Sequence, residues 1–191
     1  MTDNELLDLF HSGKREQAFK LLMKKYQQRL YWHIRRMLNN NHDSTDDVLQ
    51  NTFIKVWNAL ENFRAESQLY SWLYRIATNE AINFLNKEKR HTHISFEGGF
   101  GTDDDDENSY APQNYVKGES HNIDAEDIEA RLAKAIESLP PKQQIVFNLR
   151  YYDEMPYEEM SQVLNTSVGA LKASYFHAAQ KVETYILSEK K

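Results

Sequence analysis

The sequence predicts an all-α protein of two small helical domains, an N-terminal helical bundle and a C-terminal helix-turn-helix domain, joined by a flexible acidic linker. Apolar residues recur at steps of three and four in both halves of the chain, and strand-like alternation is nowhere sustained. Between the halves, residues 91–123 lack periodicity and contain an acidic run at 103–107, so this segment cannot bury enough apolar surface to order itself. We therefore expect domains at residues 1–90 and 124–191.

Composition narrows the class of protein. The 191 residues carry a net charge of −6, and the excess acid lies at 91–127, which hold 1 basic and 10 acidic residues. The chain has no cysteine, which excludes disulfides and thiolate metal sites. No apolar run approaches the roughly 20 residues of a membrane span, and the first ten residues lack the basic start of a signal peptide. We expect a cytoplasmic protein.

The N-terminal half predicts four helices. Thr2 and Glu5 have the spacing of a capping box, which opens a short first helix that ends near Gly13. A second helix carries apolar residues at steps of four from Ala18 to Leu38. Ser44 is positioned to cap a third helix, whose inward face is expected to hold Val48, Leu49, Thr52, Phe53, Val56, Trp57 and Leu60. A fourth helix begins at Ser67 and turns inward Leu69, Leu73, Ile76, Ala77, Ala81, Phe84 and Leu85.

The C-terminal half predicts four more helices. Asp124 is positioned to cap the first, which carries Ile128, Leu132, Ala135, Ile136 and Leu139, and Pro140-Pro141 ends it and starts the next. The second has an apolar stripe of Ile145, Val146, Leu149 and Tyr152. After a turn at 153–156, two further helices flank the polar connection at 165–167, and such a pair is a helix-turn-helix.

The last helix is the first candidate for DNA binding, because a helix-turn-helix can place its second helix in the major groove. Its exposed face would present Lys172, Ala173, Ser174, Phe176, His177 and Lys181. The alternative is a helical hairpin that merely packs. Two lysines and one histidine supply few cations for phosphate, so this domain alone should bind DNA weakly.

The fourth helix is the second candidate. Arg75, Asn79 and Asn83, followed by Asn86 and Arg90, recur at helical spacing opposite the apolar stripe. Amides can pair with base edges, and the nearby aromatic residues could stack on unpaired bases; they are Phe63, Tyr70, Trp72 and Tyr74. The alternative is a solvated helix face with some aromatic side chains in the core.

Other clusters do not support an enzyme or a metal site. His91 and His93 lack a third ligand at helical spacing, and the acidic run at 103–107 does not preorganise a coordination sphere. Asp46 and Asp47 are better explained as carboxylates near a helix start. We find no phosphate-binding glycine loop and no nucleophile elbow. We expect no catalytic residue, no cofactor and no metal.

Taken together, the motifs resemble those of bacterial sigma factors of the sigma-70 family, in the two-domain extracytoplasmic-function (ECF) group. Residues 18–38, with Tyr26, are similar to the first segment of the promoter-melting domain, and DDVLQNTFIKVW at 46–57 to its polymerase-binding helix. Phe63-Arg64 and WLYRIAxN at 72–79 resemble the segment that captures the −10 element. Leu139-Pro140, YEEM at 157–160 and SVGALK at 167–172 resemble the module that recognises the −35 element.

The resemblance implies a function and a set of sites. The chain would bind core RNA polymerase, at the β′ clamp and the β flap, and direct it to promoter DNA. The residues implied in the polymerase contact are Asp47, Gln50, Asn51 and Lys55. A base flipped from the −10 strand would be held by Phe63, Arg64, Asn79 and Asn83, and the −35 element would meet Lys172, Ala173, Phe176 and His177. The acidic linker would pass through the RNA exit path, and an anti-sigma factor is a possible partner.

Two other classes of function stay open from pattern alone. A helix-turn-helix regulator, either a repressor or a response regulator, would bind DNA without polymerase, although the helical N-terminal half argues against a receiver domain. A metal-dependent hydrolase that used the acidic run would lose activity when the linker is cut.

The −35 contact implied by the resemblance departs from the family pattern. Relatives often carry several arginines where this chain has Ala173, Ser174, Ala178 and Gln180, so its −35 contact would depend more on packing and helix-end amides.

Overall fold

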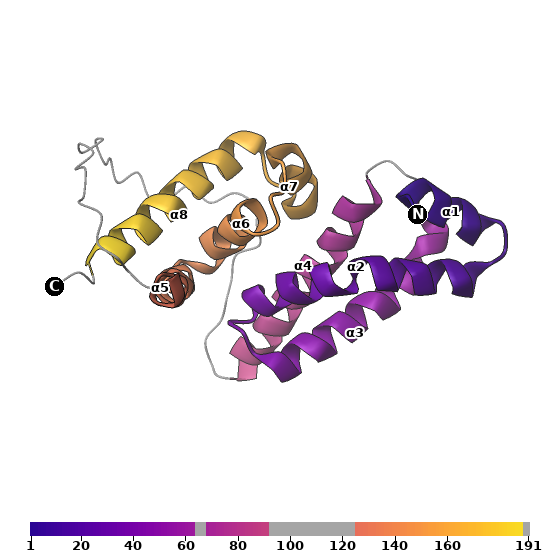
Figure 1. The fold of residues 1–191 in the computed structure, drawn as a ribbon, viewed down its shortest axis with the longest axis horizontal. Helices are drawn as coiled ribbons and strands as arrows, with labels where there is room; N and C mark the ends of the chain where they lie inside the picture. The colour runs from indigo at the N-terminus through magenta and orange to yellow at the C-terminus, as the bar shows by residue number, and fades with distance from the viewer. Residues whose placement is uncertain (64–67, 92–124, 189–191) are drawn as a thin grey trace.

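A computed structural model of the chain describes residues 1–63, 68–91 and 125–188, and every regular element within these ranges is helical. The predicted all-α fold class is confirmed. The elements form an N-terminal domain, α1 to α4, and a C-terminal domain, α5 to α8 (Figure 1). The predicted linker began at His91, but α4 includes this residue. Residues 92–123 of the predicted linker and Asp124 lie outside the described residues.

The N-terminal domain packs α1 (Asp3–His11) on α2 (Arg15–Met37), and α2 beside α3 (His42–Ala59) and α4 (Leu69–His91). A short 3-10 turn, η1 (Leu60–Asn62), follows α3. The capping box is confirmed, because the Thr2 hydroxyl accepts from the Glu5 amide and the Glu5 carboxylate accepts from the Thr2 amide. The core side chains that α2 contributes follow the predicted four-residue spacing: Ala18, Leu22, Tyr26, Leu30 and Ile34.

Two details of α3 differ from the prediction. The cap is Asn41 rather than Ser44, because the Asn41 side chain accepts from the Ser44 amide at 3.2 Å and the helix begins at His42. Trp57 was expected inside but is 39% exposed. It lies at the edge of the core, where its ring meets Phe19 at 5.0 Å between centroids.

The C-terminal domain contains α5 (Ala125–Glu137), α6 (Pro141–Tyr151), α7 (Tyr157–Leu164) and α8 (Val168–Ser188). Pro141 is the first residue of α6, as predicted, since proline lacks only an amide that would be unpaired there. Ile128 and Tyr152 were placed on inward faces but are exposed. Tyr152 is the cap residue that follows α6, so it lies past the last turn of the buried stripe.

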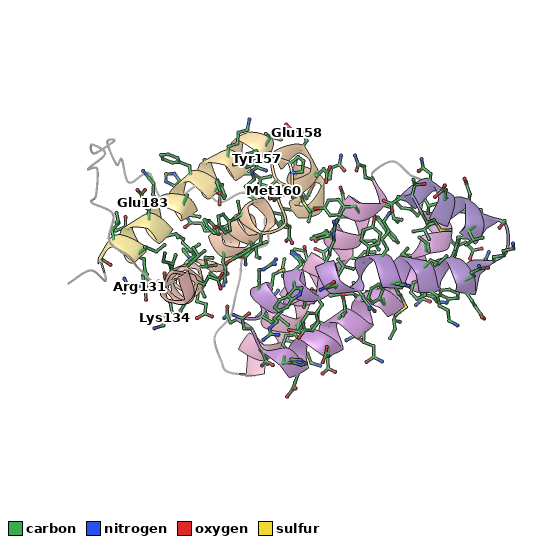
Figure 2. The ribbon with its side chains drawn as sticks, viewed as in Figure 1. Arg131, Lys134, Tyr157, Glu158, Met160 and Glu183 are labelled. Carbon is green, nitrogen blue, oxygen red and sulfur yellow. The ribbon has the colours of Figure 1, made fainter. Side chains whose placement is uncertain are left out.

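The two domains are in contact along α2 with α6 and along α4 with α7. One continuous apolar core joins the N-terminal domain to Ile145, Leu149, Met155 and Met160 of the C-terminal domain. A second, smaller cluster is internal to the C-terminal domain and includes Phe147, Ala178 and Val182. Figure 2 shows the end that carries Arg131, Lys134 and Glu183 far from α1.

Candidate nucleic-acid interface

The connection between α7 and α8 is a tight turn with a local cause. Asn165 adopts a left-handed conformation with φ 51° and ψ 45°, which asparagine tolerates better than most residues. The Ser167 hydroxyl then accepts from the Ala170 amide at 3.3 Å, which satisfies one free donor at the start of α8. The helix-turn-helix predicted at this position is therefore present.

The outer face of α8 carries the residues predicted to meet the −35 element. Leu171, Ala178 and Val182 fix the inner face in the core. The opposite face is open: Lys172, Ala173, His177 and Lys181 are exposed, and Ser174 is half-buried. Phe176 is 58% exposed, and its ring meets that of His177 on the same helix. The six predicted residues thus share one accessible side of α8.

A second polar row lies on α4. Arg75, Asn79 and Asn83 are exposed at successive turns, while Leu73 and Ala77 on the other side are fully buried. This arrangement presents a guanidinium and two amides, groups that can donate to and accept from bases. The structure therefore brings these three predicted −10 residues onto one face.

The aromatic residues near this row differ in exposure. Phe63 and Trp72 are half-buried and pack with 5.0 Å between ring centroids. Tyr74, in contrast, is almost fully buried, so the expectation that it is free to stack on bases is wrong for this arrangement. Burial raises the pKa of Tyr74 well above its ordinary value, with a further contribution from Asp153. Arg64 lies outside the described residues.

The residues predicted to meet polymerase lie along α3. Asp47, Gln50 and Asn51 are exposed on adjacent turns, and Lys55 is exposed but forms an ion pair with Glu80 of α4. Sequence reasoning selected only polar positions and missed Ile54, which lies in the same row and is 52% exposed. An apolar side chain three residues from Asn51 on a polar face was the signal that could have found it.

Sequence reasoning also missed a polar cluster between the domains, which we name the Asp153 cluster: His33, Arg36, Tyr74 and Asp153. The Asp153 carboxylate, in the turn after α6, lies 2.9 Å from His33 Nδ1 and accepts from Arg36 and from the Tyr74 hydroxyl at 3.3 Å each. Its side chain is only 6% exposed and that of His33 is 0% exposed. Spacing along the chain gives no sign of this contact, because 120 residues separate the histidine and the aspartate.

Two family profiles match the two domains. The profile of sigma-70 region 2 matches residues 22–91, and that of sigma-70 region 4 matches residues 129–182. Together they cover more than half of the chain and account for both helical units. The chain belongs to the sigma-70 family. The exposed rows on α3 and α4 therefore lie in region 2, and the helix-turn-helix lies in region 4.

The curated relatives that match nearly the whole chain are ECF RNA polymerase sigma factors, which assigns the chain to the ECF group, and solved structures share its fold. The chain is 29% identical to the ECF RNA polymerase sigma-E factor of Salmonella typhimurium over 97% of this chain and 95% of that protein. It is 28% identical to the sigma-E factor of Haemophilus influenzae, over 97% and 96%. The fold resembles CnrH, solved in complex with the cytosolic domain of CnrY, with TM-score 0.67, 22% identity and coverage of 99% of both chains. It also resembles the sigma factor RpoE of Bartonella quintana, solved with the anti-sigma factor NepR, with TM-score 0.65, 20% identity and coverage of 89% and 97%.

Within residues 1–63, 68–91 and 125–188, no helix has the length and apolar character that crossing a bilayer requires. The same ranges contain no group of three histidine or acidic residues placed to hold a metal ion. His93 and the acidic run at 103–107 fall outside the described residues.

Proposed function

We propose that this ECF sigma factor binds core RNA polymerase through α3 and directs it to promoters, without catalytic activity of its own. The observation that carries the proposal is the set of three separate exposed rows, on α3, α4 and α8, each on the side of its helix opposite the core. The side chains of these rows are not part of the apolar core of either domain. Their positions suit one protein partner and two DNA elements.

The α3 row suits the polymerase contact. Asp47, Gln50 and Asn51 offer charge and hydrogen-bonding groups, and Ile54 adds an apolar centre that a partner would remove from water. Lys55 contributes through its ion pair with Glu80, which fixes α3 against α4. By the family pattern the polymerase surfaces would be the β′ clamp for this row and the β flap for region 4.

The α4 and α8 rows suit the promoter. The amides of Asn79 and Asn83, with Arg75 beside them and with Phe63 and Arg64 before α4 in the sequence, would hold a base flipped from the −10 strand. Flipping costs a few kcal/mol of stacking, so a pocket that recovers this free energy both melts the duplex and selects sequence. On α8, Lys172, Phe176 and their neighbours would enter the major groove at the −35 element.

The cellular setting and further partner are part of the same proposal. Promoter DNA and core polymerase place the chain in the cytoplasm. Two structures that the chain resembles were solved in complex with a second protein. CnrH is bound to the cytosolic domain of CnrY, and RpoE is bound to the anti-sigma factor NepR. We therefore propose an anti-sigma partner for this chain. We also propose that the N-terminal domain comprises residues 1–90, the linker 91–123 and the C-terminal domain 124–191.

The deciding experiment measures binding to core polymerase and to DNA in one assay. Fluorescently labelled chain is titrated with core polymerase, and promoter fragments are then added to the chain alone and to the complex. We expect a complex with polymerase, and promoter binding only in that complex, because α8 supplies few cations for phosphate. Tight, sequence-specific promoter binding by the chain alone would instead identify a polymerase-independent helix-turn-helix regulator.

A further inference from the structure

Positive charge in the N-terminal domain is concentrated on α2. Residues 15–37 contain 7 basic residues and 1 acidic residue, although the whole chain carries a net charge of −6. The surfaces proposed for polymerase and promoter DNA lie on α3, α4 and α8, so they leave this charge without a role. A strongly basic helix in an acidic chain indicates an anionic ligand for its exposed side.

Three basic side chains and one tryptophan share the side of α2 that faces away from the core. At about 3.6 residues per turn, all four fall in the half of the helix opposite Leu30, which is fully buried. The first three are exposed and the last is half-buried: Lys24, Arg29, Trp32 and Arg35. We name this set the α2 basic face. It presents charge and one large ring over about three turns of helix.

Trp32 is open to solvent and has a guanidinium beside it. The residue is 44% exposed. The Arg35 guanidinium lies 5.1 Å from the centroid of the Trp32 ring, and its Nη1 atom donates to the Tyr31 hydroxyl at 3.2 Å, which fixes its position. The Tyr31 and Trp32 rings meet edge to face, with 5.6 Å between centroids. The helix thus presents a positioned indole ring and a positive charge at one place on its surface.

The cations of the α2 basic face are not neutralised by neighbouring carboxylates. Lys25, which lies outside the face, provides the contrast, because its Nζ atom lies 2.6 Å from the Asp3 carboxylate. In the described part of the chain, the ion pairs do not include Lys24, Arg29 or Arg35. The three charges are therefore available to an anion from solution.

Single-stranded nucleic acid has the chemistry that this surface requires. Proteins that bind it without sequence preference combine cations that follow the phosphates with aromatic rings on which bases stack. Duplex DNA would meet the cations, but its bases are paired and stacked inside the helix, so they cannot reach Trp32. An acidic peptide would also meet the cations but offers no base to cover the indole. The combination of charge and exposed ring therefore favours an unpaired strand.

We propose that the α2 basic face binds single-stranded nucleic acid without sequence preference, with phosphates at Lys24 and Arg29 and one base stacked on Trp32 beside Arg35. Such binding needs neither polymerase nor a promoter sequence, so it goes beyond the proposed function. Three cations give a modest affinity that rises as the salt concentration falls, because phosphate contacts release condensed counterions. DNA and RNA strands both offer phosphates and unpaired bases, and the experiment distinguishes these two sources.

The experiment measures the binding of labelled 12-nucleotide strands to the full chain at low salt by fluorescence anisotropy. The strands are (dT)12 and (rU)12, which contain no promoter sequence. Binding of either strand supports the site, and the tighter one identifies its source. We expect a duplex of equal length and a 12-residue poly-aspartate peptide to bind at least about tenfold more weakly. The proposal fails if neither strand binds, or if the duplex or the peptide binds as tightly as the strands do.

The stacking contact is tested by a matched pair of tryptophan variants. Trp32→Leu should weaken strand binding by about tenfold, because it removes the ring and keeps an apolar side chain. Trp57 on α3 is 39% exposed and its ring packs against Phe19, so Trp57→Leu should bind as the parent does. Circular dichroism establishes that both variants are folded. Equal affinities of Trp32→Leu and the parent would overturn the site.

The phosphate contacts are tested by salt dependence. For a single strand, the logarithm of the affinity falls with the logarithm of the salt concentration by about 0.7 per phosphate contact. Lys24→Gln combined with Arg29→Gln should therefore make this slope shallower by about 1.4. Lys14→Gln combined with Lys134→Gln removes the same charge at exposed positions outside the face and should leave the slope unchanged. Equal slopes for the two double variants would show that overall charge attracts the strand, which contradicts a site on α2.

Discussion

The Nδ1 atom of His33 lies 2.9 Å from the Oδ2 atom of Asp153, and this buried contact joins the two domains of the sigma factor. The other ring nitrogen of His33, Nε2, lies 3.0 Å from the hydroxyl oxygen of Thr78. His33 therefore connects α2, α4 and the turn after α6. Removal of either partner would leave the other polar group buried without its contact, which is costly in a dry interior.

Tyr74 should make the stability of the chain sensitive to alkaline pH. Burial, and then the Asp153 carboxylate, raise its pKa above the ordinary value of 10.0. Its contribution to the free energy of unfolding is therefore complete below pH 10 and is lost as the pH rises above that value, where the unfolded chain releases the proton. Tyr74→Phe should lose about 1 kcal/mol near neutral pH, from the missing hydrogen bond, and decline less steeply above pH 10.

Urea denaturation at neutral and alkaline pH measures this difference. Tyr151→Phe, at an exposed position, serves as the control and should follow the parent. An equally steep alkaline decline in Tyr74→Phe and the parent would contradict the role assigned to the buried hydroxyl.

Charge reversal on α3 should weaken polymerase binding without unfolding the domain. Asp47 is exposed, so Asp47→Lys should change the free energy of unfolding by no more than about 0.5 kcal/mol. At a complementary interface a reversed charge is strongly unfavourable, and we expect affinity for core polymerase to fall by about tenfold or more. Asp8→Lys makes the same change on α1 and should bind as the parent does. Equal affinities for the two variants would remove α3 from the proposed contact.

Asn79 should contribute to base discrimination. Its amide is exposed in the α4 row, so Asn79→Ala should leave folding intact. We expect it to weaken discrimination at one position of the −10 element by about 1–3 kcal/mol. The measurement is transcription from a set of promoters with single substitutions through that element, with Gln28→Ala on α2 as the control. Unchanged base preference would count against the assignment.

Leu171 should be essential to the helix-turn-helix. Its side chain is almost completely buried where α8 meets α7, so Leu171→Ala should lower the free energy of unfolding by about 2–5 kcal/mol. Leu187, near the end of the same helix, is exposed, and Leu187→Ala should have little effect. Thermal unfolding of the two variants tests this contrast, and similar melting temperatures would show that α8 is anchored elsewhere.

Short sequence signals predicted several helix ends correctly, because the contacts that start or end a helix involve residues close together in the chain. The Thr2 capping box, Pro141 at the start of α6 and the polar connection at 165–167 each act within a few residues of chain. The cap of α3 shows the limit of such signals. Asn41 and Ser44 are both good cap residues, and the choice between them depended on where the preceding helix ended.

Long-range burial could not be predicted in the same way. Trp57 and Ile128 have the spacing of core residues but are exposed. The Trp57 ring meets Phe10 and Phe19 edge-on at the rim of the core. Conversely, His33, Thr78 and Asn148 are polar and buried, because helices distant in sequence pack over them. Of the candidate sites, the rows on α4 and α8 followed from helical spacing, whereas the Asp153 cluster depends on docking of the two domains.

The most direct measurement of the central proposal is transcription from fragmented genomic DNA by core polymerase, with and without the purified chain, followed by mapping of transcript 5′ ends. We expect starts that require the chain and that share a −10 and a −35 element upstream. These starts should disappear with Asp47→Lys and persist with Asp8→Lys. Absence of any chain-dependent start, with a folded chain and active core polymerase, would contradict the proposal that this protein directs promoter-specific initiation.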